Sequence, residues 1–320
     1  MTVIWVPTDT HSGKTSNSNI SDAISDAKSI GAEYVFLLGD VTDNSTDAQW
    51  DNIWNLINNG EIPANRWYML AGNHDVDYGK TLAEVEVQMQ RGNPTADYYL
   101  GTLNSRAYGV FIGNLLFLMM SDIGSADGYP LCQGDWTDEM MSWWKDAVKQ
   151  YYNKCNVITC THQHVYDTNK GSTASDTFIS YINRDHEQSD EIVNWIQQYP
   201  IVAWLNGHTH GSSRDPNGIA TKYNCVFVDC DSIATWNGTY NPTDSKFLMV
   251  NSSDTEIQVK HYNHETNEWE SDYSGTIPLK FPFDPTWTPS VPPPPHEIPC
   301  IDFGKCKGFR RWILPDKRWG

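Results

Sequence analysis

The chain has 320 residues, of which 39% are hydrophobic and 19% are charged, and its net charge is −18. This composition is typical of a folded globular protein and excludes a disordered one, and no apolar run approaches the roughly 18 residues that a membrane span needs. The apolar segment at residues 3–6 is too short for a secretion signal. We therefore expect a cytoplasmic protein that has no membrane contact.

The first two hundred residues alternate short apolar runs with helical patterns, which indicates a succession of βαβ units. Apolar residues recur with a period near 3.6 around residues 20–27, 50–57 and 192–199. Thr137 is expected to cap a fourth helix that continues to Val148. The strands predicted in chain order are Val3–Val6, Val35–Leu38, Trp67–Leu70, Val110–Ile112, Leu115–Met119, Val157–Thr161, Val202–Leu205 and Val226–Val228.

Two further apolar runs, Phe247–Val250 and Ile257–Tyr262, predict a closing antiparallel pair of strands. We expect the folded α/β domain to span residues 1–280 and a tail to follow over residues 281–320. The tail contains a proline run at residues 292–295, which favours extended backbone.

The C-terminal tail differs from the rest of the chain in charge. Residues 285–320 carry six Lys/Arg and three Asp/Glu, so the preceding residues have a net charge near −21. Such an arm is suited either to packing on its own domain or to self-association or binding of a protein partner. Whether Cys300 and Cys306 pair within it stays open. The acidic body disfavours nucleic acid as a partner, because binding of phosphates rests mainly on Lys and Arg.

Polar clusters follow five of the predicted strands, where open α/β sheets bind their ligands. Imidazole together with carboxylate favours manganese, iron or zinc over magnesium or calcium. One carboxylate can bridge two such metals, so the sequence predicts a site for two divalent transition-metal ions. The candidate residues after the strands are Asp9 and His11, Asp40 and Asp43, Asn73 and His74, His162, and His208 and His210.

These clusters form a recognisable series of motifs, which are Asp9-Thr-His11, Gly39-Asp40-x-x-Asp43, Gly72-Asn73-His74-Asp75, His162 and Gly207-His208-Thr209-His210. The series resembles the calcineurin-like metallophosphoesterase family in both content and order. The resemblance implies a two-sheet β-sandwich flanked by helices, with a dinuclear metal site at the carboxyl ends of the strands.

The resemblance also implies a role for each motif residue. His74 would be the general acid, held by Asp43, and Asp75 would be a buried support. Asp43 stands where purple acid phosphatases have a metal-binding tyrosine, which disfavours that branch. The Gly72 and Gly207 motifs are most similar to those of class III cyclic-nucleotide phosphodiesterases and related enzymes of small phosphodiesters. By resemblance, seven residues bind the metals: Asp9, His11 and His210 the first, Asn73, His162 and His208 the second, and Asp40 both.

The leading hypothesis is an enzyme in which a metal-bound hydroxide attacks a small phosphodiester or phosphomonoester. The alternative is a component of a larger assembly, for example a virion, that uses the domain for structure or binding, and a nuclease is a third option. For contacts with the substrate, the sequence offers His164, Arg184 and Trp236 in loops near the motifs.

Overall fold

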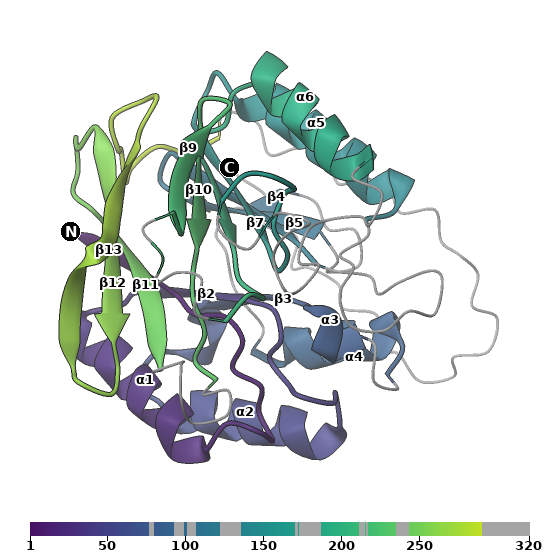
Figure 1. The fold of residues 1–320 in the computed structure, drawn as a ribbon, viewed down its shortest axis with the longest axis vertical. Coiled ribbons are helices and arrows are strands. Elements are labelled where there is room, and N and C mark those ends of the chain that lie inside the picture. The colour runs from purple at the N-terminus through teal and green to yellow at the C-terminus, as the bar shows by residue number, and fades with distance from the viewer. Residues whose placement is uncertain are drawn as a thin grey trace, which may run out of the picture.

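The structure is a computed structural model that describes residues 1–76, 80–92, 99–100, 107–121, 136–169, 172, 187–210, 215, 217–234 and 243–289. Its centre consists of two mixed sheets that pack face to face, with helices on both outer faces (Figure 1). This arrangement confirms the predicted α/β sandwich flanked by helices. Among the described residues, no helix combines the length and the apolar character that a membrane crossing requires.

The first sheet has six strands in the order β13-β12-β11-β1-β2-β3. Strands β1, β2 and β3 run parallel to one another, so their carboxyl ends lie at the same edge of the sheet. The strand bounds are β1 Thr2–Val6, β2 Tyr34–Leu38, β3 Trp67–Leu70, β11 Asp244–Val250, β12 Glu256–Asn263 and β13 Glu268–Pro278.

The second sheet has seven strands in the order β4-β5-β6-β7-β8-β10-β9. Its middle strands, from β6 through β7 and β8 to β10, are parallel, so this sheet also gathers its carboxyl ends at one edge. The strand bounds are β4 Tyr99–Leu100, β5 Ala107–Ile112, β6 Leu115–Met120, β7 Asn156–Thr161, β8 Ala203–Asn206, β9 Ile219–Lys222 and β10 Cys225–Asp229.

The helices cover the outer faces of the two sheets. In Figure 1, α1 to α4 lie on the outside of the first sheet, and α5 and α6 lie on the outside of the second. The side chain of Thr137 accepts a hydrogen bond from the amide of Met140, which confirms the predicted cap of α5. The helix bounds are α1 Asn17–Ile30, α2 Asp47–Asn59, α3 Asn73–Val76, α4 Leu82–Met89, α5 Asp138–Tyr151 and α6 Glu187–Gln198, with 3-10 turns η1 Ala64–Arg66 and η2 Gln90–Gly92.

Three buried apolar layers hold this arrangement together. Alternate residues of the strands, such as Ile4, Phe36 and Phe117, fill the space between the sheets. The opposite faces of the strands pack against the helices, where Trp50 of α2 and Trp144 of α5 are fully buried. Burial of both faces explains why the central strands are nearly continuous apolar runs.

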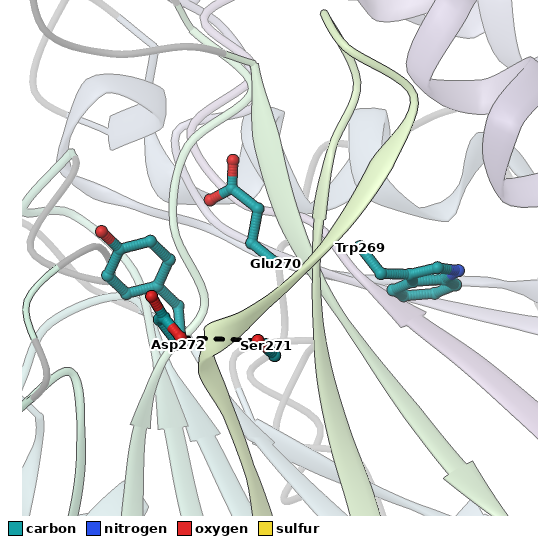
Figure 2. A pocket seen from close by; sticks show the side chains of 5 residues that line it. Trp269, Glu270, Ser271 and Asp272 are labelled. Carbon is teal, nitrogen blue, oxygen red and sulfur yellow. Dashed lines mark hydrogen bonds between the residues drawn. The ribbon is translucent and has the colours of Figure 1, made fainter.

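Strand β13 is the edge strand of the first sheet, and its side chains alternate between the two faces. Figure 2 shows Trp269 and Glu270 on opposite sides of the strand. Trp269 is one of the large apolar side chains that are exposed in the described part of the chain, whereas Glu270 is partly buried.

The packed chain continues beyond β13 into the start of the predicted tail. Phe283 is buried between the sheets, and Asn114 bonds both to the carbonyl of Pro282 and to the amide of Asp284. The ring of Trp287 lies 5.6 Å from that of Phe111. Contacts with the domain therefore extend at least to Trp287, and Cys300 and Cys306 lie outside the described residues.

Candidate metal centre

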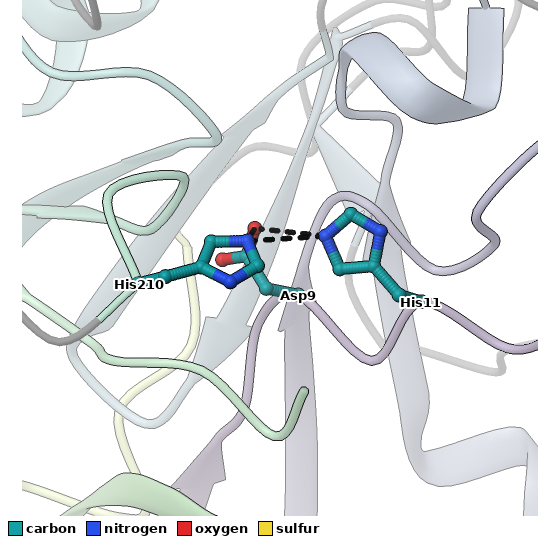
Figure 3. A group of neighbouring side chains, drawn as sticks. All are labelled: Asp9, His11 and His210. Atoms are coloured by element: carbon teal, nitrogen blue, oxygen red, sulfur yellow. Dashed lines mark hydrogen bonds and ion pairs between the residues drawn. The ribbon is translucent and has the colours of Figure 1, made fainter. Parts of the chain in front are cut away.

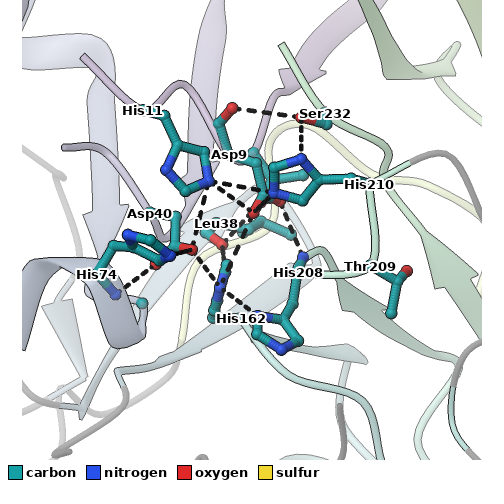
Figure 4. A network of polar contacts seen from close by, with 12 residues as sticks. Asp9, His11, Leu38, Asp40, His74, His162, His208, Thr209, His210 and Ser232 are labelled. Carbon is teal, nitrogen blue, oxygen red and sulfur yellow. Dashed lines mark hydrogen bonds and ion pairs between the residues drawn. The ribbon is translucent and has the colours of Figure 1, made fainter. Parts of the chain in front are cut away.

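The loops after five parallel strands converge on one point at the edge of the sandwich (Figure 4). Asp9 follows β1, Asp40 follows β2, and His162 follows β7. Asn73 begins α3 directly after β3, and the loop after β8 contains His208 and His210. All seven predicted ligand residues therefore belong to the carboxyl-end loops, as the sequence predicts.

Five of these residues have backbone conformations in the left-handed region. Their φ angles are 51° for Asp9, 40° for His11, 47° for Asp40, 75° for His208 and 41° for His210. Such a conformation costs roughly 1–2 kcal/mol for each residue that has a Cβ atom. Strain of this kind gathers at functional sites, where the surrounding fold imposes it.

The first group of ligand atoms comes from Asp9, His11 and His210 (Figure 3). The Oδ1 atom of Asp9 lies 3.0 Å from Nε2 of His210 and 3.7 Å from Nε2 of His11. The two imidazole Nε2 atoms are 3.1 Å apart. These three side chains therefore point at a common centre.

The second group comes from Asp40, His162 and His208. Nε2 of His162 lies 3.2 Å from Oδ2 of Asp40 and 3.1 Å from Nδ1 of His208. The same Oδ2 atom is 3.5 Å from Nε2 of His11, which belongs to the first group. Asp40 thus stands between the two groups, in the position expected of a bridging carboxylate.

The donor atoms of both groups fit metal ions. Two imidazole nitrogens that face each other at 3.1 Å repel through their lone pairs unless a proton or a metal ion lies between them. Burial disfavours charge on His11, but the nearby carboxylates of Asp43, Asp9 and Asp40 outweigh it and raise its pKa to about 9. The site therefore attracts positive charge, and a metal ion would take the place of such protons.

Hydrogen bonds behind the ligands orient them toward the centre. Nδ1 of His162 donates to the carbonyl of Leu38 at 2.8 Å, which leaves Nε2 free of hydrogen for a metal. Oδ2 of Asp9 accepts from Thr8 and from the amide of His208, so its Oδ1 faces the centre. The hydroxyl of Ser232 lies 3.4 Å from Nδ1 of His210.

Asn73 is buried at the start of α3. The next amide, that of His74, donates to Oδ1 of Asp40 at 2.9 Å, which ties α3 to the bridging carboxylate. The carboxylate of Asp75 accepts from the amides of Val41, Thr42 and Gly72 and confirms the predicted buried support.

His74 lies at the opening of the site, with 16% of its side chain exposed. Its Nδ1 atom is 2.7 Å from the backbone carbonyl oxygen of Asp43, whereas the carboxylate of Asp43 is 3.9 Å away. That carboxylate is closer to Nδ1 of His11, at 3.5 Å. Asp43 thus holds His74 through its backbone, and its side chain supports a metal ligand instead.

The three residues offered for contact with substrate are placed differently. His164 is fully buried, and its ring nitrogens contact Asn169, Asn206 and Thr209, which favours a supporting role over contact with substrate. Arg184 and Trp236 lie outside the described residues. Sequence reasoning also missed the supporting roles of Thr209, Asp229 and Ser232. Thr209 is the central residue of the Gly-His-Thr-His motif, whereas Asp229 and Ser232 belong to no motif.

Comparison with known proteins agrees with this geometry. The model of the calcineurin-like phosphoesterase family matches residues 2–212, and the chain therefore belongs to this family. No curated protein sequence matches the chain. Membership of this family supports a metal-dependent phosphoesterase in general terms, and the ligand groups described above are consistent with the divalent metals that the family typically binds.

Several solved structures resemble the fold. The purple acid phosphatase PPD1 of yellow lupin is 14% identical, with a TM-score of 0.52 over 87% of this chain and 53% of that chain. A conserved Streptococcus pneumoniae protein, described as a predicted phosphoesterase, is 14% identical, with a TM-score of 0.42 over 87% and 97%. The Escherichia coli phosphoesterase YfcE is 11% identical, with a TM-score of 0.40 over 87% and 99%. At these identities the likeness concerns the fold alone.

Proposed function

We propose that this protein hydrolyses small phosphodiesters or phosphomonoesters with two transition-metal ions, manganese, iron or zinc. The observation that carries this proposal is the position of Asp40, whose Oδ2 atom lies 3.2 Å from His162 and 3.5 Å from His11. A carboxylate between two imidazole-rich groups is suited to bridging a pair of metal ions. When bound, the metals would act as Lewis acids toward the phosphoryl oxygens and would lower the pKa of water.

The residues of the chain divide the remaining work. Asp9, His11 and His210 would hold one metal, and Asn73, His162 and His208 the other, with Asp40 shared. Burial of most of these side chains excludes bulk water and strengthens their attraction for cations. His74 is a partly exposed imidazole of the site that is not one of the seven predicted ligands, so it would be available to donate a proton to the leaving oxygen.

A substrate panel tests the activity. Protein that has been stripped with chelator should regain turnover when manganese, iron, nickel or zinc is added. The panel should compare p-nitrophenyl phosphate, bis-p-nitrophenyl phosphate and a cyclic nucleotide, since the Gly72 and Gly207 motifs are most similar to those of enzymes of small phosphodiesters. Absence of turnover on every ester with every metal would contradict the proposal.

Metal content gives an independent test. Elemental analysis should find close to two transition metals per chain. Asp40→Ala should lose both ions, because both groups share this carboxylate, whereas Asn73→Ala should mainly weaken the second. Stoichiometric calcium or magnesium without any transition metal would count against the site.

A further inference from the structure

Lys246, on β11, is a fully buried lysine outside the metal centre. A buried ammonium is costly unless nearby groups compensate its charge. Its Nζ atom lies 2.6 Å from Nδ1 of His261, on β12, and 3.0 Å from the carbonyl oxygen of Tyr273, on β13. Burial lowers the pKa of Lys246, while the carboxylates of Asp231 and Asp229 act in the opposite direction.

His261 lies among three carboxylates. Its Nδ1 atom is 3.6 Å from Asp231, and its Nε2 atom is 3.4 Å from Asp244 and 3.5 Å from Glu270. Glu270 reaches the surface at a pocket of about 360 Å³ that β13 lines (Figure 2). When Nδ1 accepts a hydrogen bond from the ammonium, the ring proton of a neutral imidazole is at Nε2, where these two carboxylates lie.

Asp231, Asp244 and His261 are close enough together to hold a metal ion. The ammonium of Lys246 already supplies positive charge there, and it would repel a divalent cation. When Nδ1 of His261 accepts a hydrogen bond from Lys246, the hydrogen of the ring is on Nε2, and this nitrogen then cannot bind a metal. The cluster is therefore better explained by an internal cation than by a third metal site.

The cluster touches the metal-binding loop through the turn that follows β10. Oδ1 of Asp229 accepts from the amide of Asp231, and Oδ2 of the same residue accepts from the hydroxyl of Thr209 at 2.6 Å. Thr209 stands between His208 and His210. Ser232, one residue after Asp231, places its hydroxyl near Nδ1 of His210.

We propose that Lys246 is a positioning residue of the metal centre. Its ammonium is fixed by His261 and Tyr273, and its charge attracts the carboxylates of Asp231 and Asp229 in the turn at residues 229–232. This turn contacts the loop that carries His208 and His210. The inference rests on the proposed dinuclear site, because a loop without metal ligands would gain nothing from being positioned.

Replacement of Lys246 by methionine tests this role, since methionine keeps much of the volume and removes the charge. Cobalt(II), followed by its visible spectrum, serves as the probe of the metal sites. We expect Lys246→Met to weaken cobalt binding by roughly 10- to 100-fold, the usual effect of removing support behind a metal ligand. The spectrum of the saturated variant should also shift, because the ligands of both metals are reoriented.

Lys260→Met is the matched control, because Lys260 lies on β12, next to His261, and is only partly buried. It should bind cobalt like the wild type. In metal-free protein, hydrogen exchange at residues 207–210 should be faster in Lys246→Met than in the control, with no difference in β2. Equal cobalt affinity, spectrum and exchange in the two variants would overturn the proposal.

Thr209→Val provides a second route to the same contact. If Lys246 acts through Asp229 and Thr209, the two substitutions should not be additive. The double variant Lys246→Met/Thr209→Val should then bind cobalt no more weakly than whichever single variant has the lower affinity. Multiplied losses would show that the two residues act separately and would overturn the proposal. Should Lys246→Met fail to fold, Asp229→Asn takes its place, and unchanged cobalt binding in that variant would also overturn it.

The wild type distinguishes failure of this inference from failure of the proposed function. A wild-type protein that binds no cobalt and hydrolyses no ester would contradict both the proposed dinuclear site and the positioning role of Lys246. If the wild type binds two cobalt ions and Lys246→Met binds them with equal affinity, only the positioning role of Lys246 is contradicted.

Discussion

The imidazole of His74 contacts the backbone carbonyl of Asp43, and this contact decides which ring nitrogen is available for chemistry. A carbonyl oxygen can only accept a hydrogen bond, so Nδ1 of His74 carries a hydrogen. The other nitrogen, Nε2, faces the metal groups at 4.0 Å from Asp40. A proton for the leaving oxygen would therefore come from Nε2.

His74→Asn should keep both metals and slow turnover by roughly 10²–10⁴-fold, which is the usual contribution of a general acid. The loss should shrink for p-nitrophenyl esters, because p-nitrophenolate leaves readily without a proton. Turnover of activated and unactivated esters by wild type and variant is the measurement. An equal loss on both kinds of ester would mean that His74 is not the acid.

The carboxylate of Asp43 supports His11 more closely than it supports His74. Asp43→Asn should therefore weaken binding of the first metal, by roughly 10- to 100-fold, and leave His74 in place through the backbone contact. At saturating metal, the ratio of rates on activated and unactivated esters should equal that of the wild type. A ratio like that of His74→Asn would show that the carboxylate acts on the acid instead.

At the scale of elements, the metal centre depends on close contact between loops of neighbouring strands. A Cβ atom on Gly72, after β3, would lie 2.3 Å from Oδ1 of Asp40 and 2.5 Å from its amide nitrogen. Only glycine allows the loop after β3 to pass so near the bridging carboxylate.

Gly72→Ala should displace Asp40 and lower both metal content and stability, the latter by about 1–3 kcal/mol as for other overpacked sites. Gly31→Ala is the control. Gly31 ends α1 with a φ of 96° and has open space around its Cα, so alanine there should cost about 1–2 kcal/mol of stability and leave the metals in place. Denaturant unfolding and elemental analysis separate the two effects. A Gly72→Ala protein with two metals would show that the loop can move aside.

The sequence predicted those elements whose residues are buried on both faces or have a clear helical period. It missed β9 and β13, because their residues are mostly polar or partly exposed. The turn between β9 and β10 was also hidden, since Tyr223 and Asn224 both have positive φ angles without a glycine to mark them.

The candidate site was predicted to the same partial extent. The motif series predicted the candidate ligand residues, which the structure brings together, because they follow strands at short distances. Lys246 and His261 belong to no motif, and they meet only because β11 pairs with β12. The backbone contact between Asp43 and His74 depends on the path of a loop, which residue types do not specify.

At the scale of the whole molecule, the first residues of the tail pack against the domain, and the basic residues of the tail come after them. Phe283 and Trp287 lie against the domain. Residues 290–320 carry six Lys/Arg and three Asp/Glu, so their net charge is positive and opposite to that of the body. Removal of these two parts should therefore have different consequences.

Truncation after residue 280 should destabilise the domain by several kcal/mol, because it removes the buried ring of Phe283 and the contacts of Asn114. Truncation after residue 289 keeps these contacts and all seven predicted ligands, so metal content and turnover on a small ester should equal those of the full chain. We expect the protein truncated after residue 289 to differ from the full chain only in self-association or partner binding, because it lacks the basic arm. Light scattering and pull-down measure this difference, and elemental analysis measures the metals. Loss of the metals on truncation after residue 289 would show that the arm belongs to the fold, and the proposed role in assembly would then fail.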